Sequence, residues 1–248
     1  MKQSLLITGA NSDIGQSSMK VLLESGMHVI AQVRSSKTLT HLKDQYGSQL
    51  DVVESNLSNY QDITSLWNYA TNSSMYPLNA IIYAAAIATP MGDVSPEEMW
   101  QVWQNTMDVN VIAPALLMKL AADHFHQHHI NGTVIMITSR AIHQGDDTNK
   151  MHYAASKAAL ANMIKTAAKN YDDYPMHVYN IAPGFVETKR IIETIMPHKP
   201  ENWIKNHFPL GSLVNPQEIA DLILFLLTKP MGYMSGATFD FNGATYLR

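Results

Sequence analysis

The sequence contains no cysteine and few charged residues, and both absences narrow the possible functions. Without cysteine, disulfide bonds, thiolate nucleophiles and cysteine-based zinc sites are excluded. Charged residues make up 15% of the 248 residues and the net charge is −4. General nucleic-acid binding needs a basic surface, so we expect no nucleic-acid partner.

Long apolar runs and flexible tracts are also lacking. The longest apolar stretch, residues 219–227, is interrupted by Asp221 and is far shorter than the roughly 20 residues of a membrane span. An apolar strand begins within a few residues of the N-terminus, which leaves no room for a signal peptide. No internal repeat, low-complexity tract or linker divides the chain. We therefore expect one domain over residues 1–248 in a cytoplasmic protein without membrane attachment.

Short apolar segments alternate with longer amphipathic segments along the chain. The short segments are typical of strands and lie at residues 5–8, 27–33, 50–54, 79–83, 133–138, 177–181 and 237–241. Helix-like sequence separates them and includes residues 95–127 and 151–170. The pattern predicts a doubly wound α/β domain whose seven-stranded sheet is mostly parallel and carries helices on both faces. Ligands of such sheets bind at the carboxyl ends of the strands.

A glycine turn joins the first strand to the first helix. It comprises Gly9, Asn11, Ser12, Asp13, Ile14 and Gly15. Such a turn aims backbone N–H groups and a helix N-terminus at one point, which suits a phosphate; a plain strand–turn–helix is the alternative for this stretch alone. Gly9 allows the tight turn, and Gly15 lets the helix pack closely on the strand. Because a carboxylate would repel a phosphate, we expect Asp13 to cap the helix by accepting backbone N–H groups.

Tyr153 and Lys157 are spaced to lie one helical turn apart on the same face. The pKa of a tyrosine is about 10, and a neighbouring ammonium group stabilises the phenolate. Lowering that pKa by roughly 3 units needs about 4 kcal/mol, which close charges in a desolvated site can supply. Tyr153 would then exchange a proton with a substrate oxygen while hydride moves at carbon. An exposed pair without function is the alternative for this spacing alone.

Taken together, the motifs resemble the classical short-chain dehydrogenase/reductase family over nearly the whole chain. The turn around Gly9 resembles that family's coenzyme turn, and Tyr153-x3-Lys157 resembles its active-site pair. Ser139 stands where the family has its catalytic serine, and Asn110 where it has a catalytic asparagine. The segment that flanks the nicotinamide is matched by Pro183, Gly184, Val186 and Thr188. Residues 208–213 and 216–227 are similar to reductases of the 3-oxoacyl-carrier-protein type.

The resemblance implies a Rossmann-type fold and an oxidoreductase that interconverts a carbonyl and a secondary alcohol of a small molecule. It also implies a homotetramer or homodimer. Ser139 would orient the substrate oxygen, while Lys157 would tune Tyr153 and hold the ribose. Pro114 lacks an N–H group, so the carbonyl of Asn110 would be free to hold a water in a proton relay. A simple proline kink is the alternative.

Two stretches depart from the family pattern. Tyr83, Ala84, Ala85 and Ala86 stand at the end of the fourth strand, where the family often shows Asn-Asn-Ala-Gly. The small alanines still permit close approach to the coenzyme, but the asparagine hydrogen bonds are missing. After the third strand, Asn56-Leu57 replaces an Asp-hydrophobic pair that commonly meets the adenine. An asparagine both donates and accepts, so contact is still expected there.

The end of the second strand favours NADP(H) over NAD(H). NAD-preferring members place an acidic residue here for the ribose hydroxyl, and none is present. Instead, Arg34 is suited to clamp a 2′-phosphate, with a hydrogen bond from Ser35. Arg34 facing solvent is the alternative. Two other functions stay open, namely an NAD-dependent alcohol or hydroxysteroid-type dehydrogenase and a dinucleotide-binding sensor with little turnover.

Several other stretches carry weaker expectations. Residues 188–207, rich in Met, Trp, Ile and His, are the expected substrate lid. His143 and His152 either line the substrate pocket or lie in a surface loop. The Met- and Trp-bearing residues 99–107 are expected in the core or in a subunit interface. No metal is expected at the histidine-rich stretch 124–129, where Asp123 is the one nearby carboxylate.

Overall fold

The structure is a computed structural model that describes residues 3–169 and 176–247. Its strands are β1 (Ser4–Thr8), β2 (His28–Val33), β3 (Leu50–Glu54), β4 (Leu78–Tyr83), β5 (Gly132–Ile137), β6 (Met176–Pro183) and β7 (Thr238–Phe241). Its α-helices are α1 (Asp13–Glu24), α2 (Thr40–Tyr46), α3 (Tyr60–Asn72), α4 (Pro96–Met107), α5 (Ala113–Gln127), α6 (Ala141–Gln144), α7 (Met151–Lys169), α8 (Trp203–His207) and α9 (Pro216–Thr228). The predicted helix end at residue 170 lies outside the described residues.

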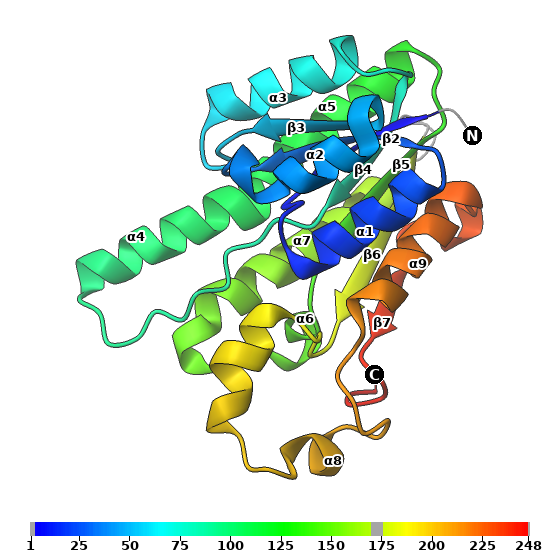
Figure 1. Cartoon of the computed structure of the whole chain (residues 1–248). Helices are drawn as coiled ribbons and strands as arrows, with labels where there is room; N and C mark the ends of the chain where they lie inside the picture. Colours follow the sequence, from blue (N-terminus) through cyan, green and yellow to red (C-terminus); the bar gives the residue numbers. More distant parts are fainter. Residues whose placement is uncertain (1–2, 170–175, 248) are drawn as a thin grey trace.

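Seven strands of the described chain form one sheet in the order β3-β2-β1-β4-β5-β6-β7. Every neighbouring pair is parallel, which confirms the predicted doubly wound arrangement. All carboxyl ends therefore lie along one edge of the sheet (Figure 1). The strand order changes direction between β1 and β4, so the turn after β1 and the loop after β4 open side by side. This is the position at which α/β sheets bind ligands.

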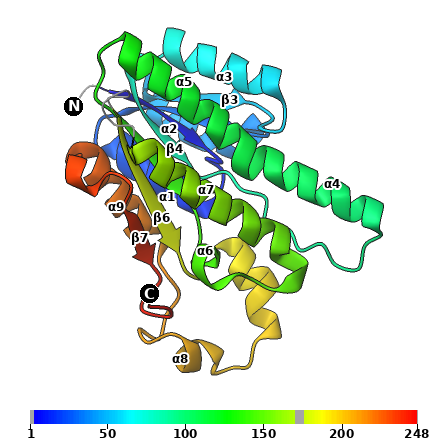
Figure 2. The ribbon, with the colours of Figure 1, turned by 180° about the vertical axis from the view of Figure 1, so that it is seen from behind.

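Helices cover both faces of the sheet, with α1, α2 and α9 on one face and α3, α5 and α7 on the other (Figures 1 and 2). Each face has its own apolar core, represented by Ile7 and Ile223 on the first and by Leu6 and Phe125 on the second. Burial on both faces explains why the strands read as nearly continuous apolar runs. Among the described residues, the structure contains no helix with the length and apolar character that a membrane crossing requires.

The predicted helical stretch 95–127 is divided by one π-helical turn. It begins at a capping box, in which Ser95 and Glu98 accept each other's backbone N–H groups. The π turn spans Asp108–Ile112, and α5 starts directly after it. Such turns occur frequently at functional sites. Before the turn, α4 extends away from the rest of the molecule (Figures 1 and 2), and of its residues Thr106 alone is buried.

Candidate active site

The turn after β1 is held by the side chain of Gln32 at the end of β2. The backbone N–H of Gly9 donates to Oε1 of Gln32 at 3.0 Å, and Nε2 of Gln32 donates to the carbonyl of Ser55 at 2.7 Å. Gly9 has a φ of +64°, and a Cβ there would lie 2.6 Å from Cα of Ala85. The loop after β4 therefore touches the turn, and only glycine fits at this contact.

Ser12, and not Asp13, caps α1, so the expectation for Asp13 was wrong. Oγ of Ser12 accepts the N–H of Gly15 at 3.1 Å and donates to the carbonyl of Gly9 at 2.8 Å. Asp13 is instead the first residue of the helix, where its carboxylate favours the helix dipole. Gly15 is packed as predicted, since a Cβ there would lie 2.5 Å from the carbonyl oxygen of Gly9.

An open pocket of about 470 Å³ lies at the carboxyl ends of β2 and β3. Its lining brings Arg34 and Asn56, two residues predicted to bind the coenzyme, together with Glu54 and Asp62. The last two escaped the sequence reasoning. Glu54 accepts the N–H of Ser36 at 2.6 Å, and hydrogen bonds with the side chain and the backbone of Ser36 lower the pKa of the Glu54 carboxyl group. The parallel pairing of β2 with β3, which places Val33 beside Glu54, was the signal that could have found it.

Four other residues predicted to bind the coenzyme lie next in sequence to the lining of this pocket or against the glycine turn. Ser35 lies in extended backbone between Arg34 and a short helical turn. Leu57 is buried at the start of the loop after β3. The N–H of Ala85 donates to Oγ1 of Thr8 at 3.3 Å, which places Ala84 and Ala85 against the glycine turn.

Ser139, Tyr153 and Lys157 come together beyond the carboxyl end of β5. Ser139 is the second residue after that strand, and its side chain shares a hydrogen bond with Tyr153. Lys157 is 2% exposed, and its Nζ donates to the carbonyl of Ile137 at 2.7 Å. The same Nζ lies 5.9 Å from the centroid of the Tyr153 ring. The structure thus brings the predicted hydroxyl, phenol and amine into one cluster.

The pKa values of this cluster differ from the expectation. Burial raises the pKa of Tyr153, and the hydrogen bond with Ser139 lowers it by less. Burial also lowers the pKa of Lys157 to about 7. A buried amine that is partly neutral near pH 7 stabilises a phenolate less than a full ammonium charge would. The expected lowering of the tyrosine pKa is therefore not present in the protein alone.

Asn110 works through its side chain as a connector. Its Oδ1 accepts the N–H of Ile87 at 2.8 Å, and its Nδ2 donates to the carbonyl of Ile87 at 2.9 Å. Nδ2 also donates to Oγ of Ser156 at 2.9 Å, so Asn110 ties the loop after β4 to helix α7 between Tyr153 and Lys157. Ser156 was missed by the sequence reasoning. A water on the Asn110 carbonyl stays a prediction.

Tyr83, the last residue of β4, binds the π turn Asp108–Ile112 that carries Asn110. Its side chain is fully buried, and its O–H donates to the carbonyl of Val109, next to Asn110. Burial raises the pKa of Tyr83, so the phenol stays a hydrogen-bond donor. Tyr83 stands at the first position of the Asn-Asn-Ala-Gly pattern. An asparagine at this position would be too short to form the hydrogen bond that Tyr83 donates to Val109.

Tyr83→Phe is expected to lower the free energy of unfolding by about 1–3 kcal/mol, because the buried carbonyl of Val109 loses its partner. Since the π turn carries Asn110, we also expect turnover to fall several-fold. Urea unfolding and steady-state rates would measure both effects. Tyr60→Phe, at a side chain that is 64% exposed, is the matched control. Equal stability of the two variants would contradict the proposed support of the turn.

The segment after β6 forms the other wall of the site. Pro183 ends that strand, and the N–H of Gly184 donates to the carbonyl of Phe241 at 2.9 Å. Val186 pairs with Val214 in an isolated bridge, and Oγ1 of Thr188 accepts the N–H of Ile191 at 3.2 Å. The predicted lid, residues 188–207, folds into short helical turns that end with α8, beyond the carboxyl ends of the strands (Figure 1).

The histidines that stood out in the sequence are placed differently from one another. His152 is fully buried and its Nε2 lies 3.1 Å from the carbonyl oxygen of Thr89, so it braces the loop after β4. The ring of His143 stacks on Tyr246 at 5.5 Å. In the described residues, no three His, Asp or Glu side chains are grouped to hold a metal ion, the stretch around His124 included.

Comparison with known proteins agrees with this geometry. A family model described as enoyl-(acyl carrier protein) reductase matches residues 9–243. Glucose 1-dehydrogenase 2 of Bacillus subtilis is 27% identical over 99% of this chain and 95% of its own. The 3-oxoacyl-[acyl-carrier-protein] reductase FabG of Rickettsia felis is 26% identical over 96% and 94%.

A solved structure of 4-hydroxyisoleucine dehydrogenase complexed with NADH has a TM-score of 0.85 and is 27% identical. The match covers 97% of both chains. These three proteins are named as dehydrogenases or a reductase, and the solved structure shares the fold over nearly the whole length. Because the family model also spans almost the entire sequence, this chain belongs to the short-chain dehydrogenase/reductase family of oxidoreductases.

Proposed function

We propose that the protein is an NADP(H)-dependent oxidoreductase that interconverts a carbonyl and a secondary alcohol, with Tyr153 as general acid and base. The observation that carries the proposal is the cluster of Ser139, Tyr153 and Lys157 at the carboxyl edge of the sheet. This cluster lies between the loop after β5 and helix α7, where the family's catalytic groups are expected. The relatives' names span a sugar, an acyl carrier and an amino acid, so they do not define the substrate.

The residues of the cluster have distinct tasks in this reaction. The hydroxyl of Ser139 holds the substrate oxygen beside the Tyr153 phenol, which gives up its proton to that oxygen during reduction and takes it back during oxidation. Lys157, positioned by the carbonyl of Ile137, lies beside the phenol as a proton reservoir because its pKa is near 7. The nicotinamide supplies the hydride when bound.

The coenzyme site fits a dinucleotide at the glycine turn. In the described turn, the amides of Gly9, Ser12 and Gly15 already have partners, whereas no partner is seen for those of Asn11, Asp13 and Ile14. These amides, at the N-terminus of α1, would hold the pyrophosphate. Ala84, Ala85 and Ala86 would lie beside it, with Pro183, Gly184, Val186 and Thr188 flanking the nicotinamide.

The preference for NADP(H) rests on Arg34 and on the lack of an acidic residue at the end of β2. Arg34 is exposed at the pocket that Asn56 also lines, in reach of an adenosine ribose. The carboxylates of Glu54 and Asp62 line the same pocket and would repel a 2′-phosphate. Glu54 also accepts the backbone N–H of Ser36, which is then not free to bind a phosphate. The proposal therefore requires the guanidinium of Arg34 to outweigh these carboxylates. An NAD-linked dehydrogenase is the alternative that they favour.

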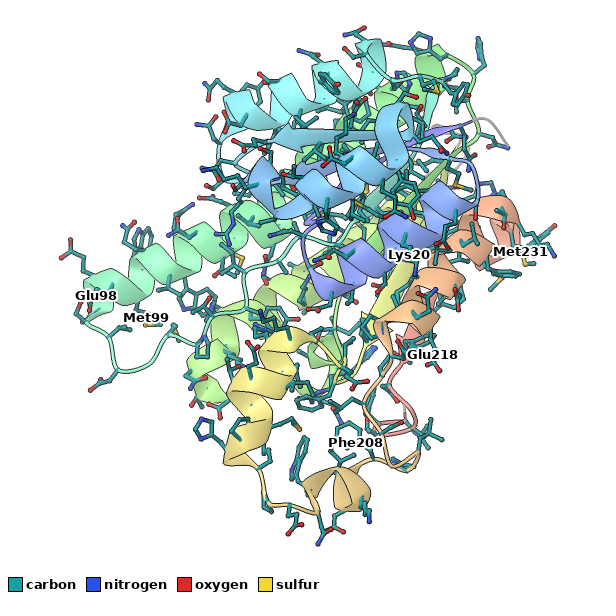
Figure 3. The ribbon with its side chains drawn as sticks, viewed as in Figure 1. Lys20, Glu98, Met99, Phe208, Glu218 and Met231 are labelled. Atoms are coloured by element: carbon teal, nitrogen blue, oxygen red, sulfur yellow. The ribbon has the colours of Figure 1, made fainter. Side chains whose placement is uncertain are left out.

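Fluorescence titration with NADPH and NADH decides between the two. We expect NADPH to bind at least about tenfold more tightly than NADH, a difference of about 1.4 kcal/mol. Arg34→Ala should remove that difference and leave the affinity for NADH unchanged. Lys20→Ala, which removes an exposed cation from α1 (Figure 3), is the charge-matched control. Tighter NADH binding by the unmodified protein would overturn the preference.

We also propose that residues 1–248 act as one domain in a homodimer or homotetramer. The support is apolar surface on helices α4 and α7, where Met99, Trp100 and Met151 are 42%, 67% and 52% exposed. Figure 3 shows Met99 at the outer end of α4, away from the body of the molecule. Exposed apolar side chains on two helices are typical of a surface that another subunit covers.

A further inference from the structure

Two arginines near the catalytic tyrosine lack an acidic partner. Arg140 follows Ser139 directly, and Arg190 lies in the lid segment. Nη1 of Arg140 donates to Oε1 of Gln144 at 2.9 Å, and Nη1 of Arg190 donates to the carbonyl of Ala88 at 3.3 Å. Both acceptors are neutral, and no carboxylate of the described residues lies within 4.0 Å of either guanidinium. Each guanidinium has five N–H groups, so most of its donors are available.

The guanidinium of Arg140 is held on an aromatic platform. Its Cζ lies 4.5 Å from the centroid of the Phe185 ring. That ring packs edge-on against Trp203 at 5.4 Å and Phe208 at 5.7 Å, and Figure 3 shows Phe208 just above α8, the last helix of the lid. The backbone N–H of Arg140 also donates to the carbonyl of Pro183 at 2.8 Å. Arg140 is thus fixed beside the segment expected to flank the nicotinamide.

Arg190 lies in the lid segment and contacts the loop after β4. Its contact with Ala88 joins the lid to the loop after β4, the loop that Asn110 ties to the catalytic helix. The positive charges of Arg190 and Arg140 lower the pKa of Tyr153, and the negative charge of the exposed Asp146 raises it. The effect of Asp146 is smaller than that of Arg190 and larger than that of Arg140. Two cations against one exposed carboxylate leave the surroundings of the Tyr153 phenol with an excess of positive charge.

We propose that Arg140 and Arg190 together bind a carboxylate of the substrate, so that the enzyme acts on an oxo acid and the matching hydroxy acid. This inference rests on the proposed function and names its substrate class. A planar guanidinium binds a carboxylate through two parallel N–H groups, and Arg140 is already oriented by its platform. The hydrogen bonds to Gln144 and Ala88 fix the two side chains without neutralising them, as a preformed anion site requires.

The test measures binding separately from turnover. Protein saturated with oxidised coenzyme cannot reduce a ketone, so calorimetric titration reports binding alone. The probes are 3-oxobutanoate, 4-oxopentanoate and 5-oxohexanoate, each compared with its primary amide. At least one acid is expected to bind about tenfold to a hundredfold more tightly than its amide, as hydrogen bonds to a charged group allow. In Arg140→Gln, that ratio should fall to about one.

Lys189→Gln is the matched control, because it removes a neighbouring cation whose side chain is 78% exposed. It should leave the acid-to-amide ratio unchanged, and Arg140→Lys should restore part of it. Equal binding of acids and amides, binding of neither, or a ratio that survives Arg140→Gln and Arg190→Gln would each overturn the inference. If the acids bind but none is reduced with NADPH or NADH, the carboxylate site stands and the proposed reaction fails.

Discussion

Tyr153→Phe is expected to reduce turnover by about 10²–10⁴-fold, the usual contribution of a positioned proton donor. The phenyl ring keeps the shape of the side chain but has no proton to exchange with the substrate oxygen. Ser139 and Lys157 stay in place, because Ala141 and Ile137 also bind them. The fold and the coenzyme affinity should therefore be preserved.

The measurement is the absorbance change of the reduced coenzyme with the best carbonyl substrate of a screening panel. Coenzyme titration of the same sample shows whether binding is intact. Tyr233→Phe, at a fully exposed side chain, controls for the loss of a tyrosine hydroxyl. Retention of more than about a tenth of the turnover would assign the proton transfer to another group, because a lost general acid costs more than that.

Gly9→Ala is expected to destabilise the fold by about 2–5 kcal/mol, combining the cost of a left-handed residue with overpacking. The new methyl group would lie 2.6 Å from Cα and 2.7 Å from N of Ala85, which are backbone atoms and cannot rotate away. The turn would have to move from the loop after β4. Because the two segments together form the coenzyme site, dinucleotide binding should be lost.

Urea unfolding and coenzyme titration would measure the two effects of Gly9→Ala. Gly26→Ala is the control, since Gly26 also has a positive φ (+79°) but a Cβ there would meet nothing within 4 Å. Gly26→Ala should lower the free energy of unfolding by about 1–2 kcal/mol, which is the cost of the left-handed backbone conformation alone. If the two variants lose equal stability, close packing against Ala85 is not what requires glycine.

The fold was predictable because strands buried on both faces leave a clear apolar pattern. Each expected strand is found within two residues of its predicted ends, and the parallel pairing of the sheet follows from the alternation with helices. The grouping of Ser139, Tyr153 and Lys157 was predictable too, since their spacing on one strand end and one helix is local. Long-range contacts were harder. Tyr83 at the end of β4 binds Val109 in the π turn, 26 residues later, and no local pattern encodes this contact.

The electrostatics of the site were the least predictable part. The sequence places an amine one turn from a phenol, but the degree of burial decides whether the pKa of each rises or falls. Likewise, Ser12 and Asp13 are both good helix caps, and only the backbone conformation shows that Ser12 precedes the first helical residue. The two carboxylates opposite Arg34 come from β3 and α3, so they required the strand register and the loop path.

Gln32 connects three chain segments that are far apart in sequence. Its one amide group binds the N–H of Gly9 and the carbonyl of Ser55, and it extends from the end of β2. The loops expected to contact adenine, ribose and pyrophosphate are thereby joined by the hydrogen bonds of one buried side chain. Little conformational entropy remains to be lost when a dinucleotide arrives, so more of its contact energy goes into affinity.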